Sequence, residues 1–402
     1  MRFESRRSGR YGLALALVLG LAIAASPSAC AQTFGTVYSF TGKVGGANPV
    51  SGLVVDNGNL YGTARAHGAS GAGVVYEING TTGAESVIYN FKGGADGADP
   101  EASLLLLGGN LYGTTLSGGG KASAGTVFEV TPAGQETVLY RFTGEADGAA
   151  PQAALTADSS GNLYGTTSSG GARGEGTVFE LIAPTVAGGA WTEQVLYSFG
   201  GSPDGARPVA GVTFDEAGNL YGTTSAGGTY GYGTVFQLVG SASGWTENIL
   251  HEFELGSDGG VPYAGISIDS LGNLYGAATE GGEGGTNGGG TVFELTPSSG
   301  GWTFELIYAL KGWKISGTYR NLLLLSGNIY ATTHCDGVPG AGTVYELSPS
   351  GDTWNYTSLQ VFTGGSGGLY SISSPVLFNG ELWGTTQLGG AYGFGTVWAV
   401  TP

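Results

Sequence analysis

The chain has little charge, little histidine and almost no cysteine. Charged residues make up 11% of its 402 residues, with 14 Lys and Arg against 31 Asp and Glu, and there are three His and two Cys. Soluble domains usually carry about 25% charged residues. So few basic residues argue against nucleic acid or an anionic membrane as partner, because both are bound through clustered Lys and Arg.

Common catalytic motifs are also absent from the sequence. It contains no nucleophile elbow, no zinc-binding helix motif and no phosphate-binding loop. Three His leave few general bases. Two carboxylates contributed by distant segments are the one catalytic arrangement that the sequence leaves open.

Residues 1–31 predict an export signal. Four arginines in the first ten residues give a basic start, and residues 12–25 form an apolar run too short to favour a membrane span. The small residues Ala29-Cys30-Ala31 fit cleavage before Gln32, while Cys30 also allows lipid attachment and Arg6-Arg7 a twin-arginine signal. Each route predicts a secreted, periplasmic or cell-surface protein.

Cleavage before Gln32 defines the expected mature chain. It leaves 10 basic and 30 acidic residues, a net charge of −20, and a single cysteine, Cys335. We therefore expect an acidic protein with no internal disulfide and no transmembrane span.

Seven copies of one phrase dominate the rest of the chain, which holds most of the 80 glycines. The fullest copy reads Gly-Asn-Leu-Tyr-Gly-Thr-Thr at 218–224 and, after a glycine-rich stretch, Gly-Thr-Val-Phe-Gln-Leu at 233–238. Its aromatic residue recurs, at steps of 51 to 57 residues, as Tyr61, Tyr112, Tyr164, Tyr221, Tyr275, Tyr330 and Trp383. A period near fifty indicates a repeat architecture.

Each copy predicts four short strands and no helix. In the fourth copy they are residues 211–215, 219–224, 233–238 and 246–253, named A to D here. Such a unit matches a propeller blade, and propellers usually have four to eight blades. The first mature strand, 36–40, resembles a D strand, and the chain ends on a C strand, 395–400. We predict an all-β, seven-bladed β-propeller over 32–402, closed by the N-terminal strand joining the last blade, which removes an exposed edge.

The repeated residues are interpreted as packing residues. Leu220 and Tyr221 face opposite sides of strand B, and Gly222 leaves room for the adjoining sheet. The Glu after the aromatic of strand C recurs in five copies, which predicts a structural hydrogen bond. Edge packing is expected for the tryptophans that precede D strands, namely Trp191, Trp245, Trp302 and Trp354.

The phrase closely resembles the GloVer (Gloeo/Verruco) tandem repeat. The third copy carries the resemblance best, with Thr-Thr-Ser-Ser-Gly-Gly at 166–171 and Gly-Thr-Val-Phe-Glu-Leu at 176–181. The resemblance covers nearly all of residues 35–402. It implies an exported bacterial repeat protein, often with a C-terminal surface anchor, but no established activity and no catalytic residues.

The loops between D and A strands carry a recurring Asp-Gly pair. In a propeller these loops share one face with the B-to-C loops, so the pairs predict an acidic arc there. Carboxylate oxygens suit calcium, which makes a weak cation site one hypothesis, and ordinary turn chemistry is the other. The aspartates are Asp96, Asp147, Asp204 and Asp258. No other cofactor is expected.

Departures from the repeat are the best candidates for ligand binding. His67 and the run His334-Cys335-Asp336 interrupt two B-to-C loops, where a metal is a weaker alternative to a plain surface loop. The loop 311–319 replaces Asp-Gly with two Lys and two aromatic residues, and flat aromatic faces suit sugar rings. Its candidate contacts are Lys311, Trp313, Lys314 and Tyr319.

These observations favour a non-enzymatic extracellular binding or scaffold module with a glycan or protein ligand. One alternative is a polysaccharide-degrading hydrolase or lyase with carboxylates at the channel mouth. A purely structural cell-surface protein is another.

Overall fold

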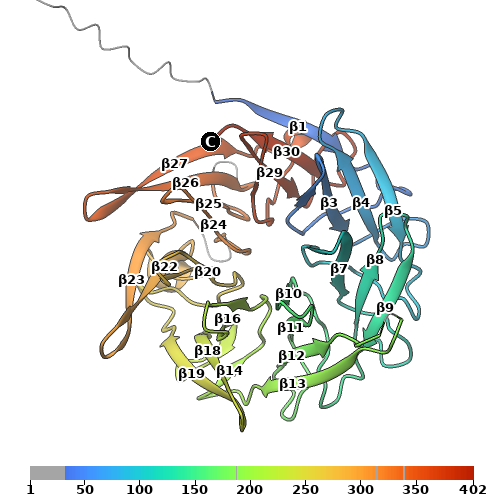
Figure 1. Cartoon of the computed structure of the whole chain (residues 1–402). Coiled ribbons are helices and arrows are strands. Elements are labelled where there is room, and N and C mark those ends of the chain that lie inside the picture. Colours follow the sequence, from blue (N-terminus) through green and yellow to red (C-terminus); the bar gives the residue numbers. More distant parts are fainter. Residues whose placement is uncertain (1–31, 187, 313–315, 338–339) are drawn as a thin grey trace, which may run out of the picture. The chain divides into compact units, whose positions relative to one another are not determined.

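A computed structural model describes residues 32–402 except 187, 313–315 and 338–339. In these residues seven four-stranded antiparallel sheets surround a central axis as the blades of a propeller (Figure 1). The predicted all-β, seven-bladed fold is therefore confirmed. The predicted export signal, with Cys30, lies outside the described residues.

In blades 1 to 6, strands A to D run in chain order from the axis to the rim, and in blade 7 the N-terminal strand takes the place of strand D. Blades 1 to 4 comprise β2 (Val54–Asp56), β3 (Asn59–Ala64), β4 (Val74–Asn79) and β5 (Glu85–Asn90); β6 (Leu105–Leu107), β7 (Asn110–Thr115), β8 (Thr126–Val130) and β9 (Glu136–Arg141); β10 (Thr156–Ala157), β11 (Leu163–Thr167), β12 (Thr177–Ile182) and β13 (Thr192–Ser198); and β15 (Thr213–Phe214), β16 (Leu220–Thr224), β18 (Thr234–Ser241) and β19 (Gly244–Glu252).

Blades 5 to 7 comprise β20 (Ser267–Ile268), β21 (Leu274–Ala278), β22 (Thr291–Ser298) and β23 (Gly301–Ala309); β24 (Leu323–Leu325), β25 (Asn328–Thr332), β26 (Thr343–Ser350) and β27 (Thr353–Val361); and β28 (Val376–Phe378), β29 (Glu381–Thr386), β30 (Thr396–Val400) and β1 (Phe34–Ser39). The loops add a small pair, β14 (Gly205–Ala206) with β17 (Ala226–Gly227), and two 3-10 turns, η1 (Gly285–Asn287) and η2 (Gly365–Gly367).

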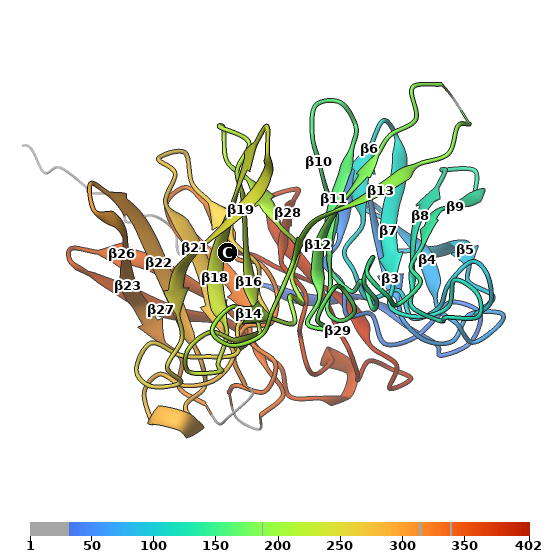
Figure 2. The same cartoon turned by 90° about the horizontal axis from the view of Figure 1, so that it is seen from below.

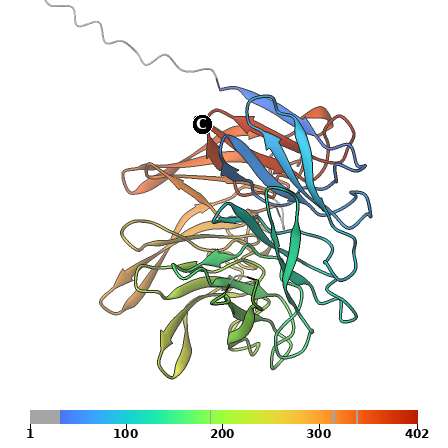
Figure 3. The ribbon, with the colours of Figure 1, turned by 45° about the vertical axis from the view of Figure 1, so that its right-hand side comes forward.

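The two ends of the propeller meet in the last blade. Strand β1 pairs antiparallel with β30, from Phe34 opposite Val400 to Ser39 opposite Thr396 (Figure 3). The Thr33 N–H also donates to Thr401 Oγ1 at 2.8 Å. The predicted closure by the N-terminal strand is confirmed, and it leaves the C strand of this blade paired on both sides.

The hydrophobic core lies between the blades. The described residues form seven apolar clusters, and each cluster draws its side chains from two neighbouring blades. In the cluster between blades 3 and 4, Tyr164 of one blade meets Leu220 and Phe236 of the next. The two residues of the Leu-Tyr pair thus serve the two flanking interfaces, as predicted from their opposite faces.

The phrase requires a glycine for a different reason from the one expected. Gly222 lies directly opposite Phe236 in the register of β16 with β18. A Cβ on Gly222 would stand 2.6 Å from Phe236 Cζ, far inside contact distance. The space is therefore taken by the aromatic ring of the same blade, and the expectation that the adjoining sheet needs it was wrong.

The two threonines that follow bind two different partners. In six blades the first donates its hydroxyl to a carbonyl of the next blade at 2.8–3.2 Å, which links the blades into a ring. In five blades the second shares a hydrogen bond of 2.8–2.9 Å with the threonine that opens strand C. Packing and hydrogen bonding thus account for the Leu-Tyr-Gly-Thr-Thr part of the phrase.

The recurring Glu of strand C also has a structural role. In four blades it accepts the hydroxyl of the strand B tyrosine at 2.7–3.0 Å, as Glu180 does from Tyr164. In blade 4 Gln237 donates to Tyr221 Oη at 2.6 Å instead. The predicted structural hydrogen bond is confirmed. Edge packing is confirmed too, because the four tryptophans lie part-buried against the inter-blade clusters. Trp191 directly precedes its D strand, and the other three are the second residues of theirs.

Candidate functional site at the channel mouth

The D-to-A and B-to-C loops share one face of the propeller. Within single blades they pair through short bridges, such as Ala98 with Ser117 and Ala149 with Ser169. Figure 2 shows these loops along one edge, with η1 among them, and the A-to-B and C-to-D connections along the opposite edge. The predicted sorting of loops to the two faces is confirmed.

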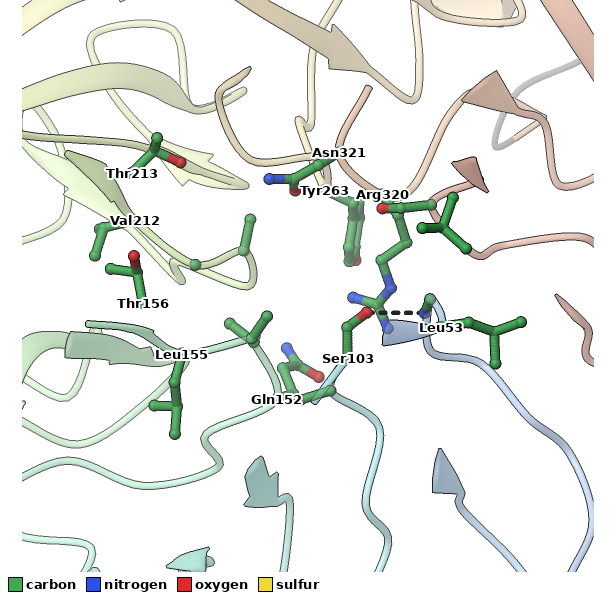
Figure 4. A pocket seen from close by; sticks show the side chains of 18 of the residues that line it. Leu53, Ser103, Gln152, Leu155, Thr156, Val212, Thr213, Tyr263, Arg320 and Asn321 are labelled. Carbon is green, nitrogen blue, oxygen red and sulfur yellow. Dashed lines mark hydrogen bonds between the residues drawn. The ribbon is translucent and has the colours of Figure 1, made fainter. Parts of the chain in front are cut away.

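A cavity of about 320 Å³ opens on the axis, where the D-to-A loops lead into the innermost strands. All seven blades contribute to its wall. Most of the lining is small or apolar, and the larger polar side chains come from a few blades (Figure 4): Ser103, Gln152, Tyr263, Arg320 and Asn321. The described residues of its lining include no Asp or Glu.

Arg320 occupies a position that other blades fill with a small residue. The ring of threonine hydrogen bonds identifies this position, because its carbonyl accepts the hydroxyl of the preceding blade. In the six blades where that bond forms, the acceptors are Ser51, Ala102, Ala153, Ala210, Ala264 and Ser373. Blade 6 has Arg320 at the equivalent position. The bond does not form there, because the preceding blade 5 has Ala277, which carries no hydroxyl, in place of the donor threonine. Arg320 is thus an addition to the repeat, unlike its packing residues.

The guanidinium of Arg320 reaches across the channel to blades 1 and 2. Its Nε donates to the Val50 carbonyl and its Nη2 to the Glu101 carbonyl, both at the long distance of 3.4 Å. The Glu101 carboxylate is bound at 2.8 Å by Arg65. Burial lowers the pKa of Arg320, and the nearby charge of Glu101 opposes this shift. In the described part of the chain, Arg320 forms no ion pair of its own.

Backbone bonds hold two of its polar neighbours in place. Asn321 accepts the Gly265 N–H at 3.0 Å, and Ser103 accepts the Gly52 N–H at 2.8 Å, so each ties its loop to the preceding blade. Figure 4 shows Arg320 directed toward Ser103 and Gln152 on the far wall. The wall therefore presents fixed polar groups around one cation.

An aromatic row runs beside this cavity through blades 5, 6 and 7. Ring centroids are 5.1 Å apart between Tyr263 and Tyr319, 5.3 Å between Tyr319 and His334, and 4.7 Å between His334 and Tyr370. Burial raises the pKa of the Tyr319 hydroxyl, which keeps it neutral. The Cys335 Sγ lies 3.0 Å from His334 Nδ1. Two of the predicted ligand residues, Tyr319 and His334, are thus adjacent, and Tyr263 joins them to the cavity wall.

The other predicted ligand residues lie in two further places. Lys311 and Asp336 line a separate groove of about 330 Å³ with Tyr308 and Tyr356 of blades 5 and 6. His67 packs on Phe394, with ring centroids 5.1 Å apart, where the loops of blades 1 and 7 meet. The candidates Trp313 and Lys314 lie outside the described residues.

The four aspartates of the Asp-Gly loops bind groups within their own blades. Each accepts a backbone N–H four residues earlier at 2.6–3.0 Å, and each bonds the Tyr or His near the end of its D strand at 2.8–3.1 Å. Where the structure describes the chain, no group of three or more His, Cys, Asp or Glu is placed to hold a metal ion. This arrangement fits turn chemistry, and calcium at these loops stays a prediction.

Outer clusters of tyrosine and carboxylates join neighbouring D strands. Tyr197 donates to Asp204 at 3.1 Å and approaches Glu247 of the next blade at 3.5 Å. Burial, with the charge of Asp204, raises the pKa of Glu247 to about 7. In place of such a cluster, His251 stacks on Phe304 of the following blade, with ring centroids 3.9 Å apart. His251 thus packs between two neighbouring blades.

Sequence reasoning missed Arg320, as well as its cavity neighbours Ser103, Gln152, Tyr263 and Asn321. Arg320 follows Tyr319 directly, but the loop before it departs from the other copies and hides the alignment. A buried apolar residue precedes strand A in each of these blades, Leu104 in blade 2 and Leu322 in blade 6. The residue two positions before it is Ala102 in blade 2 and Arg320 in blade 6, so the two are equivalent. That offset was the available signal.

Fold and site together define a repeat-built β-propeller with a polar, copy-specific channel mouth. The family model described as the Gloeobacter/Verrucomicrobia repeat matches residues 24–187 of the chain. The resemblance to the GloVer repeat is thereby confirmed over that part of the chain. No curated protein matches the sequence.

Solved structures share the fold at low sequence identity. A polysaccharide lyase, the PL25 ulvan lyase bound to a GlcA(1-4)Rha3S saccharide, is 12% identical with a TM-score of 0.52, over 88% of this chain and 93% of that chain. An ancestral GH74 enzyme is 14% identical with a TM-score of 0.59, over 88% of this chain and 48% of that one. This chain thus spans about half of the GH74 enzyme.

Within the described residues no helix is both long and apolar enough to cross a membrane.

Proposed function

We propose that the protein is an exported, non-enzymatic binding module that holds a glycan at the channel mouth. The observation that carries the proposal is that the repeated residues and the residues specific to single blades have different roles. Residues present in every blade are engaged in packing and structural hydrogen bonds, whereas Gln152, Tyr263, Arg320 and Asn321 differ between blades and line one cavity.

The chemistry of the cavity suits a sugar. Its volume lies at the lower end of ligand sites, which span roughly 300–1,000 Å³. Amide, hydroxyl and guanidinium groups offer donors and acceptors to sugar hydroxyls. The row from Tyr263 to Tyr370 adds flat aromatic surface beside them. A concave site of this size is less suited to a protein surface, which needs roughly 800 Å² on each partner.

The alternative of a polysaccharide-degrading enzyme has less support. The lyase and the GH74 enzyme share the fold, and their names fit this alternative, but at 12% and 14% identity the likeness extends to the fold alone. Hydrolysis needs two carboxyl groups about 5–10 Å apart. The described lining of the cavity offers none. A purely structural role would leave the copy-specific polar residues without a purpose.

A glycan array followed by titration calorimetry tests the proposal. The purified protein is compared with Tyr263→Ala and Gln152→Ala at the cavity, and with Leu271→Ala as a matched control. Leu271 is 79% exposed on an A-to-B turn of the opposite face. We expect a hit whose affinity falls in both cavity variants and is unchanged in the control. Binding that falls equally in all three variants, or no hit at all, would contradict the proposal.

A further inference from the structure

We infer that the ligand of the channel mouth carries an oxyanion on a sugar ring, a carboxylate or a sulfate ester, and that Arg320 binds it. This inference rests on the proposed function, and it names the chemical class that the site selects. It rests on the burial of the Arg320 guanidinium and on its hydrogen-bond partners.

Arg320 is a part-buried cation that forms no ion pair in the described residues, although the charge of Glu101 acts on it. Charges withdrawn from water are normally paired, because an isolated one loses its hydration without compensation. In the described residues its hydrogen bonds are two contacts of 3.4 Å to the carbonyls of Val50 and Glu101. The carboxylate of Glu101, whose charge acts on Arg320, is held by Arg65 at 2.8 Å. A guanidinium has five N–H donors, so most of its capacity is left for a ligand.

The fold itself does not require this arginine. Ala102, Ala153, Ala210 and Ala264 fill the equivalent position in four blades, and each is at most 5% exposed. The inter-blade packing at this position is therefore satisfied by a methyl group. A long cationic side chain that extends into the channel from such a position is better explained by a ligand than by stability.

The geometry of the group selects an oxyanion. The planar fork of a guanidinium matches the two oxygens of a carboxylate or sulfate and binds them through paired hydrogen bonds. Gln152, Ser103 and Asn321 are neutral, so they suit the hydroxyls of the same sugar. A neutral sugar alone would leave the cation unpaired when water is displaced from the cavity.

The acidic character of the chain does not prevent this binding. The net charge is −17, so an anion meets repulsion at long range. Exposed charges are screened beyond about 8–10 Å at ordinary salt. A contact inside the cavity is screened much less. The described lining holds no Asp or Glu that would repel the anion at contact distance.

Calorimetry with matched oligosaccharides tests the inference. The probes are trigalacturonate, its carboxyl-reduced neutral counterpart, a sulfated galactose trisaccharide and an Asp-rich peptide. The proteins are wild type, Arg320→Lys and Arg320→Ala. Arg320→Ala installs the residue of four other blades, so it is expected to fold, and a thermal melt checks this.

We expect wild type to bind one of the anionic trisaccharides about 10- to 100-fold more tightly than the neutral one. Arg320→Ala should remove this preference, and Arg320→Lys should retain only part of it. Which anionic trisaccharide is preferred identifies the carboxylate or the sulfate. Equal affinity for charged and neutral sugars, unaffected by Arg320→Ala but lost in Tyr263→Ala, would overturn the inference and leave the proposed function standing. Absence of binding to every sugar would overturn both, as would Arg320-dependent binding of the peptide alone.

Discussion

Replacement of Gly222 by alanine tests how the repeated phrase builds a blade. The new Cβ would lie 2.6 Å from Phe236 Cζ and 3.0 Å from its Cε1. Ordinary carbon contacts are about 3.5–4.0 Å, so the ring must move by roughly 1 Å or more. Phe236 is fully buried between blades, which leaves it little room. Overpacking of this kind usually destabilises by about 1–3 kcal/mol, and we expect Gly222→Ala to fall in that range.

Urea unfolding followed by tryptophan fluorescence measures the effect. The matched control is Gly35→Ala, in the strand β1, where a Cβ would meet nothing within 4 Å. We expect this control to be neutral or slightly stabilising, because alanine restricts the unfolded chain. Adding Phe236→Leu to Gly222→Ala should recover part of the loss in a double-mutant cycle. The steric explanation is refuted if Gly222→Ala and Gly35→Ala have equal stability, or if the cycle shows no coupling.

Three further predictions follow from the inter-blade contacts. Thr166→Val removes the 2.9 Å hydrogen bond to the Ala210 carbonyl and leaves that acceptor buried, so unfolding measurements should show a loss of about 1–3 kcal/mol, against little change for an exposed threonine. Burial and the charge of Asp147 raise the pKa of Glu193 to about 7, so the folded state binds the extra proton and stability should fall as the pH rises from about 4.5 to 7. Glu193→Gln should be as stable as wild type at pH 4 and more stable at pH 8; a wild-type stability that rises over this range would contradict the assignment. His251→Tyr restores the residue of other blades and should shift stability by less than about 1 kcal/mol, whereas a larger loss would show that the stacked His is needed.

The fold could be predicted from the sequence because the same pattern of strand and turn residues occurs in each copy. The unmatched strands at 36–40 and 395–400 imply closure of the ring. The role of Gly222 could not be predicted in the same way. It depends on the cross-strand register that places it opposite Phe236, and the sequence does not state that register.

The site was only partly predictable. Tyr319 and His334 were found because they break the repeat, and the structure brings them together. Lys311 and Asp336 also break it, yet they lie in a different groove, since position along a loop does not fix the distance from the axis. Arg320 was missed because the irregular loop before it hides its alignment with the small residues of the other blades.

The most direct test of the channel mouth as a binding site is a crystal structure of the protein with trigalacturonate. We expect the sugar in the axial cavity, with its carboxylate within hydrogen-bond distance of the Arg320 guanidinium and a ring near Tyr263. A sugar bound instead in the groove beside Lys311, with Arg320 still bonded only to the carbonyls of Val50 and Glu101, would contradict this account.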